Sequence, residues 1–145
     1  MNLIDFNSPE KYVNQMEKEA HNNNCAGIVD AYFKFTIRSR QDIACSNDVS
    51  CGSFVETMKM FIFPKYFGQV DCSKLLNTET YLKVAKEIKQ DTEQDKLEDP
   101  SWVVKYGMQG PYFNQNPMKS SNEWKKIRLD VINEGIEQLQ KAENK

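Results

Sequence analysis

The sequence lacks the residue patterns that mark most catalytic and cofactor sites. It has no Gly-x-Ser-x-Gly turn, no glycine-rich phosphate loop and no His-Glu-x-x-His helix, and its single histidine is His21. His21 opens a run of four polar residues, 21–24, which favours a surface position at the end of a helix. These absences argue against acyl hydrolysis, nucleotide binding and zinc chemistry, and we expect no cofactor and no bound metal.

Long apolar runs and a strong charge of one sign are missing as well. No stretch approaches the roughly 18 apolar residues of a membrane-spanning helix. A net charge of −2, without a basic cluster, offers no electrostatic footprint for nucleic acid. We therefore expect neither a membrane span nor nucleic-acid binding. The N-terminal residues 1–6 are not a signal peptide, because they lack a basic stretch followed by an apolar one, so an exported protein would have its signal outside this chain.

The sequence does contain four cysteines, all within residues 25–72. No two have the spacing of a zinc-ligand pair, and an even number of cysteines in a small domain favours disulfides. Of the three possible connectivities we predict Cys25 with Cys72 and Cys45 with Cys51. Two disulfides would place the protein in the periplasm or outside the cell, because disulfides persist in oxidising compartments. The alternative is four buried free thiols in a cytoplasmic protein.

Apolar residues recur three and four positions apart over most of the chain, which predicts helices. We expect helices from Pro9 to the polar residues 21–24, from Cys25 to the loop at Cys45, over residues 53–63, from Thr78 through Ile88, and over residues 121–142. The fold class is therefore all-α, a bundle of about five helices in a single domain of residues 1–145. A long, irregular, aromatic-rich loop is expected before the last helix.

Local signals set the expected helix boundaries. Ser53 with Glu56, and Ser120 with Glu123, have the spacing of capping boxes, and Thr78 is a third expected N-cap. Pro64 is expected to end the third helix, because proline disfavours helical geometry in the residue before it. Gly135 lies within a broad apolar stripe of the last helix, which indicates close approach of another backbone.

The leading hypothesis for function is a non-enzymatic protein that binds another macromolecule, such as an inhibitor or immunity protein of a secreted toxin. Residues 91–99 carry five acids against one lysine, and residues 100–117 hold an unusual number of rings for a connector. The acids would steer a basic partner, and the rings would supply buried area. The predicted partner-binding residues are Asp91, Glu93, Asp95, Trp102, Tyr106, Tyr112 and Phe113. In size and cysteine placement the chain resembles small periplasmic immunity proteins of bacterial competition systems, and no motif assigns it to a family.

Two alternative functions remain open. The first is a carrier for an apolar small molecule held between helices, in a cavity lined by soft or aromatic side chains. Its expected lining is Met16, Met58, Met60, Phe61, Phe63, Tyr66 and Phe67. The second is a small lysozyme-like hydrolase that uses Glu56 with Asp71 or Asp48, because glycoside hydrolysis needs only two carboxylates. The oligomeric state is open.

Overall fold

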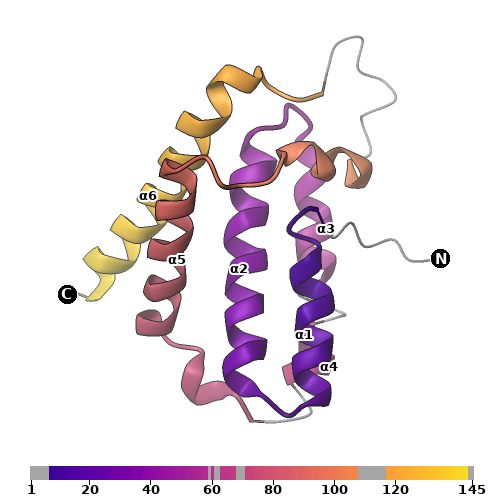
Figure 1. Cartoon of the computed structure of the whole chain (residues 1–145), viewed down its shortest axis with the longest axis vertical. Helices are drawn as coiled ribbons and strands as arrows, with labels where there is room; N and C mark the ends of the chain where they lie inside the picture. Colours follow the sequence, from indigo (N-terminus) through magenta and orange to yellow (C-terminus); the bar gives the residue numbers. More distant parts are fainter. Residues whose placement is uncertain (1–6, 59, 61–62, 68–70, 108–116, 144–145) are drawn as a thin grey trace.

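Helix α2, Cys25–Ala44, lies at the centre of the structure, between α1, Lys11–His21, and α5, Thr78–Glu93 (Figure 1). The last helix, α6, Trp124–Glu143, packs against both α2 and α5. The computed structural model describes residues 7–58, 60, 63–67, 71–107 and 117–143. Within these ranges no strand occurs, and one isolated antiparallel bridge joins Ser46 to Met118. The predicted mainly α fold is confirmed.

The chain returns along the bundle through short elements before α5 begins. From the end of α2 it passes through η1, Val49–Cys51, and α3, Gly52–Thr57. It then continues through α4, Phe63–Phe67, and η3, Ser73–Leu75. This return brings the start of α5 to the end of the bundle where α2 begins, so that α2 and α5 run in the same direction (Figure 1). A seven-residue 3-10 helix, η4, Pro100–Tyr106, follows at the opposite end.

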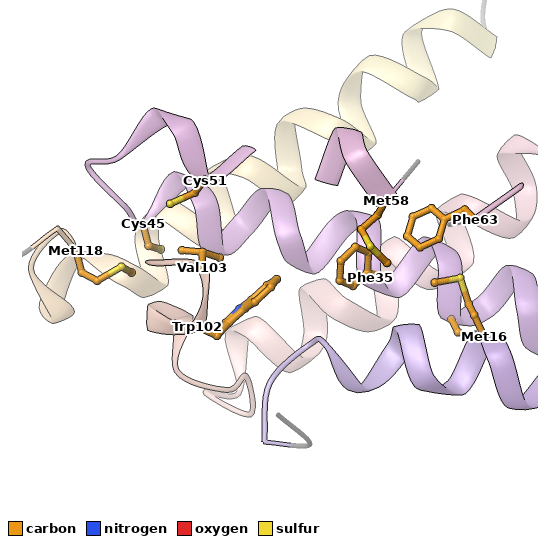
Figure 2. Close-up of a cluster of buried hydrophobic side chains, with 10 residues drawn as sticks. Met16, Phe35, Cys45, Cys51, Met58, Phe63, Trp102, Val103 and Met118 are labelled. Atoms are coloured by element: carbon orange, nitrogen blue, oxygen red, sulfur yellow. The ribbon is translucent and has the colours of Figure 1, made fainter. Parts of the chain in front are cut away.

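The central position of α2 explains why apolar residues occupy more than one of its faces. Phe35 on one face joins Met16 of α1 and Trp102 of η4 in a buried cluster (Figure 2). Val29 on another face joins a second cluster with residues of α5 and α6, among them Val84 and Ile132. A helix with neighbours on several sides must bury most of its circumference.

Two α-helices begin at an asparagine whose side chain accepts a backbone N–H. Asn24 caps α2 by accepting from Gly27, and Asn77 caps α5 by accepting from Thr80 at 2.8 Å. The N-cap predicted at Thr78 is therefore one residue too late. Ser120 was expected to form a capping box, but its hydroxyl donates to the Asn122 side chain instead, and its own side chain makes no cap. A short 3-10 turn, η6, Ser121–Glu123, precedes α6.

The predicted helix over residues 53–63 is wrong in its extent. Helix α3 ends at Thr57, and Pro64 is the second residue of a separate helix, α4, that begins at Phe63. Proline is tolerated in the first turn of a helix because the N–H that it lacks would have no partner in the helix there. Ser53 lies within α3, where its hydroxyl donates to the carbonyl of Ser50, so the capping box predicted with Glu56 is also wrong.

One of the two predicted disulfides is present. Cys25 at the start of α2 is bonded to Cys72 just before η3, and this bond indicates an oxidising environment. The prediction of a Cys45–Cys51 bond is wrong, because both are buried free thiols. Their sulfur atoms have different neighbours: Cys45 Sγ lies 3.9 Å from the carbonyl oxygen of Trp124, and Cys51 Sγ lies 3.8 Å from the Ser46 hydroxyl.

Among the described helices none is both long and apolar enough to cross a membrane.

Candidate functional site

A cleft of about 700 Å³ opens between α2, α4, α5 and α6. Its wall is mainly aromatic and aliphatic, with a few polar side chains. The lining residues are Tyr32, Phe33, Arg40, Phe63, Pro64, Phe67, Leu76, Asn77, Thr78, Tyr81, Gly135, Gln138 and Leu139. Leu76 is 42% exposed, so water reaches the apolar wall. An apolar hollow with a few polar groups is the usual form of a small-molecule site.

Edge-to-face ring contacts hold the aromatic wall in place. The ring of Tyr32 on α2 meets those of Phe63 and Phe67 on α4, each with centroids 5.2 Å apart and planes at 89°. Next to Tyr32, at a centroid distance of 5.5 Å, Phe33 of α2 meets Tyr81 of α5, at 5.2 Å. Aromatic pairs favour this geometry because the electron-poor edge of one ring faces the electron-rich face of the other. The rings therefore form one connected, ordered wall.

Arg40 is the one charged side chain among the described residues that line the cleft. It lies seven positions after Phe33, on the same face of α2, and it hydrogen-bonds with Tyr81. Burial raises the pKa of the Tyr81 hydroxyl, and the positive charge of Arg40 opposes part of that rise. The Tyr81 hydroxyl is therefore neutral at physiological pH. The cleft combines an apolar wall with a single positive charge.

Gly135 leaves space in the wall of the cleft that α6 provides. A Cβ atom placed on Gly135 would meet nothing within 4 Å. The prediction that another backbone approaches Gly135 closely is therefore wrong. The broad apolar stripe of α6 has a different explanation, because α6 packs against both α2 and α5 and also lines the cleft.

The disulfide lies beside the same cleft. Cys72 leads through η3 to Leu76, Asn77 and Thr78, which form one edge of the opening. The bond to Cys25 fixes this segment to the first residue of α2. The connection between α4 and α5 is therefore held against the bundle where the cleft opens.

The expected lining of a carrier cavity is correct in part. Phe63 and Phe67 do line the cleft. Met16 and Met58 are instead buried in the core beneath α1 and α3, as Figure 2 shows. Of the remaining three, Met60 is 67% exposed, Tyr66 packs against the core without lining the cleft, and Phe61 lies outside the described residues.

The structure describes five of the seven predicted partner-binding residues and places them in two different settings. Asp91, Glu93 and Asp95 are exposed at the end of α5, where Asp95 forms an ion pair with Lys125 at 3.2 Å. The two rings that the structure describes lie inward: the side chain of Trp102 is 8% exposed, and Tyr106 is half-buried. Tyr112 and Phe113 lie outside the described residues.

Trp102 belongs to a buried polar cluster that joins three elements. Its indole N–H donates to Asp42 of α2, and Asp42 also accepts from Arg38 at 2.8 Å and from Arg128 of α6 at 3.0 Å. Arg38 makes a second ion pair, with Glu98, at 3.3 Å. Asp42 is fully buried, so the two guanidinium groups supply the compensation that a buried carboxylate requires. The cluster explains why Trp102 lies inward.

Tyr106 is held inward by a second buried acid. Its hydroxyl donates to Glu10, which is 3% exposed and also pairs with Lys105 at 2.5 Å. Burial raises the pKa of the Tyr106 hydroxyl, and the hydrogen bond to the negatively charged Glu10 raises it further. Together with Trp102, this contact fastens η4 over the end of the bundle.

Two of the three carboxylates considered for hydrolysis, Asp48 and Asp71, lie at turns. Asp48 is fully buried and accepts from the backbone N–H and the hydroxyl of Ser50. Asp71 accepts in the same way from Ser73, and these hydrogen bonds lower the pKa of Asp71. Glu56 is exposed on α3. Within the described ranges, no three His, Cys, Asp or Glu side chains come close enough to hold a metal ion.

Comparisons with protein-family models, with curated proteins and with solved structures found nothing that matches this chain.

Proposed function

We propose that the protein is a non-enzymatic binding protein that carries an apolar small molecule in the cleft between α2, α4, α5 and α6. The observation that carries the proposal is the cleft itself. Its volume of about 700 Å³ falls within the range of roughly 300–1,000 Å³ that is typical of small-molecule sites. The lining, with an aromatic wall and few polar groups, is also typical of such sites.

The cost of leaving this wall in water supports the same proposal. Protein interiors are close-packed, and each Å² of apolar surface left in water forgoes about 25 cal/mol of stabilisation. Phe63 is almost fully buried, but Leu76 remains 42% exposed and Gly135 adds no side chain, so part of the apolar lining is left in contact with water. An apolar ligand in the cleft would cover this surface.

The disulfide supports an oxidising compartment as the place where the protein acts. The Cys25–Cys72 bond fits a protein that acts in the periplasm or outside the cell. In such a compartment, a carrier would keep an apolar molecule dissolved between membranes or between cells.

Binding of an uncharged fluorescent probe, N-phenyl-1-naphthylamine, tests the proposal. The decisive variant is Gly135→Leu, which places a side chain in the open space of the cleft. Its matched control is Asn133→Leu, which adds the same side chain to an exposed position of α6 outside the cleft. We expect saturable binding to the unchanged protein and to Asn133→Leu, and binding weakened about tenfold or more by Gly135→Leu.

Circular dichroism must show that all three proteins are equally helical. Failure of the unchanged protein to bind the probe saturably would refute the carrier function. Equal binding by Gly135→Leu and Asn133→Leu would place the probe elsewhere and refute the cleft as the site.

A second candidate is recognition of another macromolecule, such as a toxin that the protein inhibits. It is favoured by the exposure of Asp91, Glu93 and Asp95 at one end of α5. Affinity purification from the native host, with mass spectrometry, would provide the partner. Reversing the three charges should then slow association and reduce its dependence on salt. If both stay unchanged, the three acids are not the contact surface.

A further inference from the structure

We infer that the molecule held in the cleft is a single-chain amphipath with an anionic head group, which Arg40 binds. This inference rests on the proposed function and specifies its ligand. Its basis is the distribution of charge around the cleft. Arg40 is the single charged lining residue in the described part of the chain, so no acidic side chain there competes with a ligand for the guanidinium group.

The other two arginines differ from Arg40 in both burial and pairing, because Arg40 is exposed whereas Arg38 and Arg128 are buried. Arg38, two positions earlier on α2, is buried and bonded to both Asp42 and Glu98. Arg128 on α6 is also paired with Asp42. Arg40, by contrast, forms no ion pair with a described carboxylate, and its described polar contact is the neutral hydroxyl of Tyr81. A guanidinium group offers two parallel N–H donors to a carboxylate or phosphate, which matches an anionic head group.

The start of α5 adds a second source of positive potential. Asn77 and Thr78, the N-cap and first residue of α5, line the same cleft. The aligned peptide dipoles of this 16-residue helix give its N-terminus a partial positive charge, which favours anions nearby. Glu79 in the first turn of α5 offsets part of this potential, so Arg40 is the main positive group that an anion in the cleft would meet.

The rest of the lining fits an acyl chain. Phe33, Phe63 and Phe67 provide ring surfaces, and Leu76 and Leu139 add aliphatic surface. None of these side chains can hydrogen-bond, so a polar tail would lose its hydration without compensation. An amphipath would place its chain against the rings and its charged end at Arg40.

Competition against N-phenyl-1-naphthylamine with three ten-carbon compounds tests the inference. Decanoate and decyl phosphate carry an anionic head group, and decanol is the neutral match of the same chain length. All three are used below the concentrations at which they aggregate. We expect the anions to displace the probe at concentrations roughly tenfold lower than decanol, the size expected of one hydrogen-bonded charge pair.

The arginine is tested with Arg40→Gln and, as a control that keeps the charge, Arg40→Lys. Probe affinity is measured for each variant, and the preference is expressed as the ratio of the decanol to the decanoate or decyl phosphate concentrations that displace half of the probe. This ratio should fall to about one in Arg40→Gln, whereas Arg40→Lys should retain most of it. A preference for decanoate alone identifies a carboxylate ligand, and a preference for decyl phosphate alone identifies a phosphate ligand. Both outcomes support the inference.

Two results would overturn the inference while leaving the proposed function intact. One is equal displacement of the probe by decanol and by the anions. The other is a preference for anions that survives Arg40→Gln. Absence of probe binding in the unchanged protein would instead refute the proposed function, and the inference with it.

Discussion

Trp102 donates its indole N–H to the carboxylate of Asp42 at 2.6 Å, although the two residues lie 60 positions apart in the sequence. The acceptor is fully buried and the indole is nearly so. Because Asp42 also accepts hydrogen bonds from Arg38 and Arg128, this carboxylate connects α2, η4 and α6. The stability of the end of the bundle covered by η4 depends on this connection.

We expect Trp102→Phe to lower the free energy of unfolding by about 1–3 kcal/mol, because it removes a hydrogen bond to a buried charged acceptor. The matched control is Trp124→Phe, since the Trp124 indole donates to the Lys119 carbonyl in an exposed hydrogen bond. Urea unfolding followed by circular dichroism measures both variants. If Trp124→Phe lowers the free energy of unfolding as much as Trp102→Phe does, the buried hydrogen bond contributes no more to stability than the exposed one.

Reduction of the disulfide should destabilise the protein. The bond closes a loop with a sequence separation of 47 residues, and the chain-entropy treatment assigns such a crosslink about 4 kcal/mol. We expect reductant to lower the urea concentration at which half of the unchanged protein is unfolded. The double variant Cys25→Ser, Cys72→Ser should unfold at that lower midpoint with or without reductant. A midpoint unaffected by reductant in the unchanged protein would contradict the bond.

The ion pairs of Glu98 predict a loss of stability in acid. Burial alone would raise the pKa of Glu98, but the hydrogen bond from Lys11 and the charge of Arg38 outweigh it and lower the pKa below the ordinary value of 4.5. A group whose pKa is lower in the folded than in the unfolded state stabilises the fold at pH values above its unfolded-state pKa. This stabilisation is lost as the pH falls through the folded-state pKa.

Glu98→Gln should therefore be less stable than the unchanged protein at neutral pH, and the difference should shrink as pH falls below about 4.5. Urea unfolding across a series of pH values measures this difference. Glu134→Gln on the exposed face of α6 should show no such convergence. A difference between Glu98→Gln and the unchanged protein that stays constant with pH would contradict the role assigned to the ion pairs.

The free thiols should be unreactive in the folded protein. Burial raises the pKa of the Cys45 thiol to about 11, so only a small fraction is thiolate at pH 8. Iodoacetamide should label the native protein slowly at pH 8, and the rate should rise with pH. In urea without reductant, mass spectrometry should find two labelled thiols, Cys45 and Cys51. No labelling in urea would mean that the two are bonded to each other.

Local patterns in the sequence were sufficient to predict the long helices and one disulfide. The apolar face of α2 and the stripe along α6 are patterns of residues three and four positions apart. The end of α1 is marked by the consecutive polar residues 21–24. The Cys25–Cys72 bond followed from the expected positions of the helix ends. These predictions depend on near neighbours in the chain, where sequence spacing determines which side chains share a face.

Features that depend on distant residues could not be predicted in this way. Trp102 follows an acidic segment and precedes glycines and prolines, so it resembled an exposed anchor. Its burial depends on Asp42, Arg38 and Arg128, and nothing near it in the sequence indicates them. The cleft is similar, because its lining comes from four helices and the residues between α4 and α5. Gly135 was the one local signal, and we interpreted it as close packing when it marks open space.

The cluster around Asp42 also constrains the order in which the chain can acquire its structure during synthesis. The two later donors to Asp42 are Trp102 and Arg128, 60 and 86 residues further along the chain. Until these two residues have been synthesised, Asp42 has only Arg38 of its own helix among the three donors to its carboxylate described above. Burial of that acid without its full set of partners would be costly, so we expect the Asp42 end of α2 to become buried only after α6 has been synthesised.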